Sequence, residues 1–132
     1  MATNWTQQKI FMISFSVKDI KNEFDPGSYA RGISYYNQGR VTKLKLLKQA
    51  ADYLDLYGEV TGSFRYAQEI TVYKNAFDVD VEGECSCPVG FNCKHVVAVL
   101  LEYIAFSRQH STQYQESKSL KLIAKQPHYA SP

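Results

Sequence analysis

The chain has 132 residues, of which 45% are hydrophobic and 21% charged, and its formal net charge is +2. This length and composition predict one globular domain and exclude a disordered chain, and so small a charge does not mark a general polyanion binder. The longest nearly uncharged apolar run, residues 95–106, is shorter than the roughly 18 residues of a membrane span. The first residues lack the pattern of a secretory signal, so we expect a cytoplasmic (bacterial) or nuclear protein, not a secreted one.

Charge divides the chain near residue 106. Residues 1–106 hold eleven Lys and Arg against twelve Asp and Glu, whereas residues 107–132 hold four against one. We therefore predict a partly ordered N-terminal extension over 1–23, a folded domain over 24–106 and a polar, weakly basic tail over 107–132. Residues 10–24 fit either an early strand or a short helix.

A helix is predicted over about 26–38. Asp25 is a suitable N-cap, and Pro26 then falls at the first helical position. Apolar side chains follow at helical spacing, and Gly39 suits the left-handed residue that ends a helix. Gly32 lies inside this helix, where glycine costs about 1 kcal/mol relative to alanine. We expect another element to approach closely there.

After Gly39 the apolar residues alternate with polar ones, which predicts four short strands over about 41–83. The short links between them favour an antiparallel meander. In the last strand, Phe77, Val79 and Val81 form an apolar face, and the residues between them form an acidic one. The whole is an α+β fold: a helix, a small antiparallel sheet, a Cys₃His loop and a C-terminal apolar helix.

Cys85 and Cys87 continue the alternation of the last strand and fall on its predicted buried face, with Phe77, Val79 and Val81. Because residues i and i+2 of an extended chain point the same way, their sulfurs converge. Cys93 and His95 follow at the start of the apolar helix. Three cysteines within nine residues do not make a disulfide framework, so we interpret these four residues as metal ligands.

Zinc suits three thiolates and one imidazole, the ligand set of a closed structural site. Soft ligands exclude magnesium and calcium, but they leave cobalt and other thiophilic metals open. Cys93 as a nucleophile with His95 as its base is the enzymatic alternative. Residues i and i+2 at a helix entry do not readily face each other, so we expect no enzyme and no small-molecule substrate.

The segment CSCPVGFNCKH, followed by VVAVLLEYIAF, resembles the SWIM zinc finger, with its C-x-C and C-x-H pairs. Ser28–Val41 (SYARGISYYNQGRV) resembles the segment that precedes this finger in bacterial Swi/Snf-type helicase-like ATPases. The resemblance implies a zinc-binding accessory module that binds DNA and is part of, or associated with, such an ATPase. The chain has no P-loop of its own.

Six basic residues are candidates for phosphate contacts, which give affinity without sequence choice. They are Arg31, Arg40, Lys43, Lys45, Lys48 and Lys94. The acidic strand would repel a nucleic acid, so any such contact must use a different surface. The alternative function is a protein-interaction or autoregulatory module that docks on the ATPase motor or on another partner.

Overall fold

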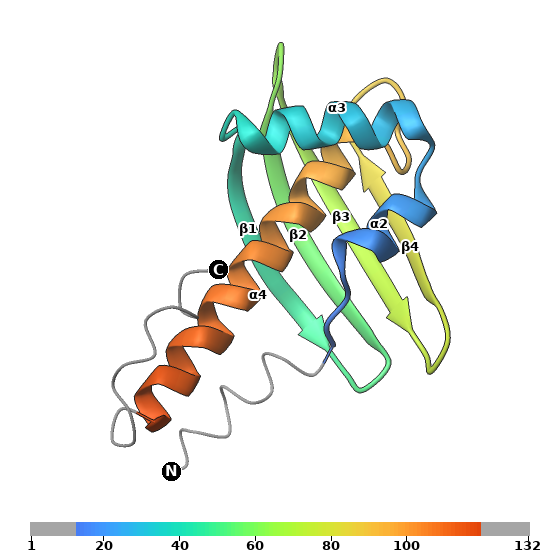
Figure 1. Cartoon of the computed structure of the whole chain (residues 1–132). Helices are drawn as coiled ribbons and strands as arrows, with labels where there is room; N and C mark the ends of the chain where they lie inside the picture. The colour runs from blue at the N-terminus through green and yellow to red at the C-terminus, as the bar shows by residue number, and fades with distance from the viewer. Residues whose placement is uncertain (1–12, 120–132) are drawn as a thin grey trace.

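The computed structural model describes residues 13–119, with side chains to Arg108, and has an α+β fold (Figure 1). In this part of the chain, three helices accompany a four-stranded antiparallel sheet. In chain order the elements are α2 (Val17–Glu23), α3 (Pro26–Asn37), β1 (Val41–Gln49), β2 (Tyr53–Thr61), β3 (Arg65–Lys74), β4 (Val79–Cys85) and α4 (Lys94–Ser119).

The sheet is a meander with the strand order β1-β2-β3-β4, and every neighbouring pair is antiparallel, as the sequence predicts. Helix α4 crosses one face of the sheet, and α3 lies across the first turns of α4 (Figure 1). The opposite face carries no helix in the described part of the chain. We call this opposite side the open face.

The caps of α2 and α3 follow from their sequences. Ser16 and Asp19 form a reciprocal capping box at the start of α2. At the start of α3, the Asp25 carboxylate accepts a hydrogen bond from the Ser28 amide (3.0 Å), which lowers the pKa of Asp25. Gly39 has a φ of +71°, so the predicted left-handed ending of α3 is confirmed.

Three glycines, each on a different neighbouring element, allow α4 to pack closely, and each of them contacts a different valine of α4. A Cβ on Gly32 of α3 would lie 2.4 Å from Val97 Cβ, which confirms the predicted close approach. A Cβ on Gly83 of β4 would lie 2.5 Å from the Val96 side chain. A Cβ on Gly58 of β2 would lie 2.6 Å from the Val99 side chain. The first turns of α4, which carry a metal ligand, are thus fixed by backbone contact.

Within the predicted N-terminal extension, the structure forms the short helix α2 and not a strand, and the side chains of Ile13 and Ile20 are buried in the core. Helix α4 continues to Ser119 and so includes the first half of the expected tail; residues 120–132 lie outside the described part. Phe77 was expected on the buried face of the last strand, but it is 92% exposed. It lies in a turn, where its backbone amide donates a hydrogen bond to the Asn75 side chain.

No helix among the described residues is long and apolar enough to cross a membrane.

Candidate metal centre

Four ligand side chains meet where β4 ends and α4 begins. Cys85 is the last residue of β4, and Cys87 follows in the turn. Cys93 directly precedes α4, and His95 lies in its first turn. All four residues are buried, and their ligand atoms lie within 4.8 Å of one another.

The spacing of these atoms fits a tetrahedral zinc site. His95 Nδ1 lies 3.6 Å from Cys85 Sγ and 3.5 Å from Cys93 Sγ. Bonds of about 2.3 Å to sulfur and about 2.05 Å to nitrogen at a tetrahedral angle would place the two ligand atoms about 3.6 Å apart. The residues present therefore fit zinc, with Nδ1 as the nitrogen ligand. Zinc would supply a closed structural link between β4 and α4.

Asn92 holds the metal loop against the outer edge of β4. Its φ is +43°, in the left-handed region where asparagine is among the few tolerated side chains. The side chain accepts from the Gly83 amide (2.8 Å) and donates to the Val81 carbonyl (3.1 Å). The Asn92 amide donates to the Gly83 carbonyl (2.8 Å). The loop thus occupies the hydrogen-bonding groups of an edge strand that would otherwise be free.

Cys93 stands directly before the N-terminus of α4. The Cys93 carbonyl accepts hydrogen bonds from the amides of Val96 (3.0 Å) and Val97 (3.2 Å). The positive end of a helix dipole favours negative charge, so this end of α4 suits a site built from thiolates.

The Cys93 thiol and Cys85 interact strongly. The hydrogen bond with Cys93 lowers the pKa of Cys85 well below its ordinary range and outweighs burial, which acts in the opposite direction. The same contact, together with burial, raises the pKa of Cys93. Of these two thiols, Cys85 is therefore the more readily ionised. Cys93 must lose a proton when metal binds.

Cys93 and His95 do face each other, contrary to the sequence expectation, because both side chains turn toward the cluster. The contact with Cys85 and burial raise the pKa of Cys93, which favours the protonated thiol over the thiolate that a nucleophile requires.

Aromatic rings enclose the imidazole. The Tyr66 ring centroid lies 4.8 Å from that of His95, and the Tyr35 ring meets His95 edge-on at 5.3 Å. Phe64 packs on Tyr66 with centroids 6.2 Å apart and is itself 70% exposed. These rings join the metal centre to α3 and to the β2–β3 hairpin.

The six basic candidates lie in three places. Arg40 and Lys94 both contact the Tyr35 ring, with Arg40 Cζ 5.0 Å and Lys94 Nζ 5.5 Å from its centroid. Arg31 lies apart, beside Asp25 at the start of α3. The third group lies on the open face of β1 and comprises Lys43, Lys45 and Lys48.

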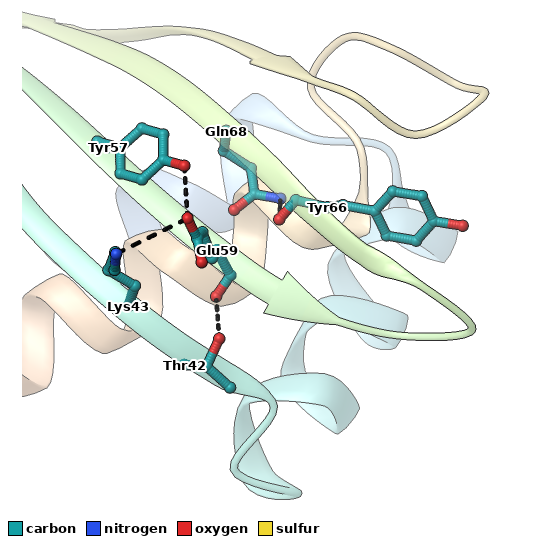
Figure 2. A network of polar contacts seen from close by, with 6 residues as sticks. All are labelled: Thr42, Lys43, Tyr57, Glu59, Tyr66 and Gln68. Carbon is teal, nitrogen blue, oxygen red and sulfur yellow. Dashed lines mark hydrogen bonds and ion pairs between the residues drawn. The ribbon is translucent and has the colours of Figure 1, made fainter.

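The open face brings the β1 lysines together with carboxylates. Lys43 lies 4.0 Å from Glu59, which also accepts a hydrogen bond from the Tyr57 hydroxyl at 2.6 Å (Figure 2). These contacts, the Tyr57 hydrogen bond foremost, lower the pKa of Glu59. Across the four strands, Lys45, Tyr57, Glu69 and Glu84 stand in one row. The predicted basic ribbon and the acidic strand therefore share one surface.

Two residues beside the metal ligands, Gln68 and Asn92, were not predicted from the sequence. Gln68 is buried on β3 and donates a hydrogen bond to Cys85 Sγ (3.3 Å). The sequence contains a signal for this role: Gln68 alternates with Ile70 and Val72 along β3, so its amide lies on an otherwise apolar strand face. No comparable signal pointed to Asn92, because its role depends on the left-handed backbone that it adopts in the loop.

A known protein family matches the segment that contains the metal ligands. Residues 69–104 match the family model of the SWIM zinc finger. This part of the chain is a SWIM zinc-finger module with a Cys₃His zinc-binding site, a kind of small binding module that is not typically catalytic.

One relative is an uncharacterized protein of Methanocaldococcus jannaschii, 33% identical over 85 residues. The match covers 64% of this chain and 32% of that protein, so the chain spans about a third of the relative's length. No solved structure gives a significant match. The resemblance of Ser28–Val41 to Swi/Snf-type ATPases stays a prediction.

Proposed function

We propose that this chain is a zinc-stabilised nucleic-acid-binding module. One observation carries the proposal: the side chains of Arg40 and Lys94 both lie against the Tyr35 ring, which itself touches the metal ligand His95. Neither cation forms an ion pair with a described acidic side chain. Arg40 Nε and Nη1 donate hydrogen bonds to Gln38 Oε1 (2.8 Å) and to the Thr61 carbonyl (3.0 Å), which leaves Arg40 Nη2 and Lys94 Nζ to contact phosphate. We call Tyr35, Arg40, Phe64, Tyr66 and Lys94 the aromatic-basic cluster.

The cluster has the two components that a single-stranded nucleic acid requires. Cations provide affinity for the backbone, and an aromatic face accepts a base by stacking. Phe64 is exposed at the β2–β3 hairpin and packs on Tyr66. Zinc acts indirectly here, because it fixes the start of α4 and with it Lys94.

The lysines of β1 do not belong to this surface. Glu59, Glu69 and Glu84 share their sheet face, and like charges would repel a phosphate backbone there. Arg31 is also left out, because it lies beside Asp25.

The open face supports a second candidate, docking on a partner protein with a basic surface, such as a Swi/Snf-type ATPase motor. Glu69 and Glu84 stand directly opposite each other on β3 and β4, an arrangement that destabilises a sheet. No described Lys or Arg forms an ion pair with either carboxylate. Both carboxylates line a depression with a volume of about 290 Å³, which the exposed side chains of Leu47 and Phe91 also line. A basic partner surface would neutralise these carboxylates.

Fluorescence anisotropy with labelled single-stranded and duplex DNA at low salt tests the first candidate. We expect binding that weakens steeply with salt, and a salt slope that falls by about two when Arg40→Ala and Lys94→Ala are combined. Lys18→Ala with Lys21→Ala removes the same charge from exposed positions of α2 and is the matched control. The absence of a complex at low salt, or equal losses in both double variants, would overturn the proposal.

The second candidate predicts the opposite pattern. Glu69→Lys with Glu84→Lys should abolish capture of an ATPase motor while leaving DNA binding intact. If capture survives this charge reversal, the open face is not the docking surface.

A further inference from the structure

Gln68 is a polar residue in an apolar position. It lies on β3, directly opposite Cys85 of β4, and its side chain is 0% exposed. The residues that follow it on the same strand face, Ile70 and Val72, are buried aliphatic side chains. A buried amide is costly unless its groups find hydrogen-bond partners, so its presence here calls for a compensating contact.

The Gln68 amide nitrogen makes two hydrogen bonds. Nε2 donates to the Tyr66 carbonyl (3.0 Å) and to Cys85 Sγ (3.3 Å). Figure 2 shows the Gln68 amide nitrogen next to the Tyr66 carbonyl. The opposite amide orientation would place Oε1 against a carbonyl oxygen and a thiolate, two acceptors. The two partners therefore fix which end of the amide faces the metal centre.

Packing alone does not account for this side chain. Oε1 is buried without a hydrogen-bond partner among the described residues. It lies beside Gly58, where an added Cβ would be 3.3 Å from Oε1. A methionine would fill nearly the same space without leaving an unsatisfied acceptor. What the amide adds is the N–H···S hydrogen bond to a metal ligand.

We propose that Gln68 is a positioning residue of the zinc centre. Its amide holds the Cys85 sulfur in place and draws negative charge from it, in a site where three thiolates outweigh the charge of Zn²⁺. Hydrogen bonds to ionised groups are stronger than those between neutral groups, and partners of metal ligands commonly tune metal affinity. Gln68 lies just outside the part of the chain that matches the SWIM model, residues 69–104, and is not one of its four ligands. The proposal does not depend on nucleic-acid binding.

Gln68→Met in the full chain tests this role. Competition with a chromophoric zinc chelator should show affinity about 10–100-fold weaker than in the wild type. With Co²⁺ in place of zinc, the sulfur-to-metal charge-transfer band should shift, because the sulfur loses a hydrogen-bond donor. Gln49→Met is the matched control: Gln49 is a partly buried glutamine of β1 whose Oε1 is also unpartnered, and it makes no described contact with the metal ligands. We expect its zinc affinity and cobalt spectrum to be unchanged.

A measurement on the wild type covers the case in which Gln68→Met does not fold. In the ¹¹³Cd-loaded protein, scalar coupling through the N–H···S–Cd path should correlate the cadmium resonance with a Gln68 side-chain amide proton. Wild-type affinity with an unshifted cobalt spectrum in Gln68→Met would overturn the proposal. So would a cadmium spectrum that shows ligand couplings and none to Gln68.

Discussion

Gly32 of α3 and Val97 of α4 touch so closely that no side chain fits between them. A Cβ on Gly32 would lie 2.4 Å from both Cβ and Cγ1 of Val97, and 2.9 Å from the Lys94 carbonyl. The same turn of α4 carries Lys94 and His95, so this contact sets where the metal ligand and its neighbouring cation lie relative to α3. Helix packing and the metal centre are thus coupled through one residue.

Gly32→Ala should destabilise the zinc-loaded protein, although alanine is the better helix former by about 1 kcal/mol. Overpacking of a tight contact costs typically about 1–3 kcal/mol, and here a backbone carbonyl cannot move aside. Chemical denaturation measures the effect. Gly27→Ala in the same helix is the control: its Cβ would meet only the flexible Arg31 guanidinium and the Asp25 carboxylate, at 3.3 Å or more, so stability should stay level or rise.

Gly83→Ala should be rescued by Val96→Ala. The added Cβ would lie 2.5 Å from Val96 Cγ1 but 3.3 Å from Val96 Cβ, so removal of the valine methyl groups relieves most of the overlap. A double-mutant cycle should give a coupling of about 1–3 kcal/mol. Val97→Ala should rescue Gly32→Ala poorly, since Val97 Cβ itself is in the way. Strictly additive effects at Gly83 and Val96 would show that the close contact is absent.

Asn92→Gly isolates the side-chain contacts of the metal loop, because glycine keeps the left-handed backbone at no steric cost. The variant loses the hydrogen bonds to Gly83 and Val81, which should destabilise the fold by about 1–3 kcal/mol. Hydrogen exchange at the Gly83 amide should accelerate. If Gly83 exchanges as slowly as in the wild type, Asn92 does not hold the loop to β4.

Zinc affinity should rise with pH. The pKa of Cys93 is raised, so this thiol is protonated near neutrality and must release a proton to bind metal. The pKa of Cys85 is lowered, so Cys85 adds no further proton release there. Chelator competition between about pH 6 and pH 8 should show affinity rising by at least about tenfold per unit. Affinity that does not change with pH would contradict this order of ionisation.

Much of the fold followed from local signals. Asp25, Pro26 and Gly39 mark the limits of α3 by rules that act within a few residues, and alternation alone defined the four strands. The ligands were equally predictable, because Cys85 and Cys87 continue the alternation of β4 and His95 lies in the first turn of an apolar helix. These features depend on neighbours in the sequence.

The rest depended on contacts between distant segments. Phe77 alternates in sequence with the buried residues of β4, but it lies in the turn that Asn75 stabilises, and β4 begins only at Val79. The β1 lysines formed a basic row in the sequence, and only the strand register placed Glu69 and Glu84 on their face. Arg40 and Lys94 are 54 positions apart and meet only because Tyr35 lies between them.

X-ray absorption at the zinc edge identifies the metal ligands, on protein purified under reducing conditions and with its metal content determined. We expect one zinc per chain with three sulfur ligands at about 2.3 Å and one nitrogen at about 2.0–2.1 Å. A folded protein without metal, or a zinc shell containing oxygen or fewer than three sulfurs, would contradict a site made by Cys85, Cys87, Cys93 and His95.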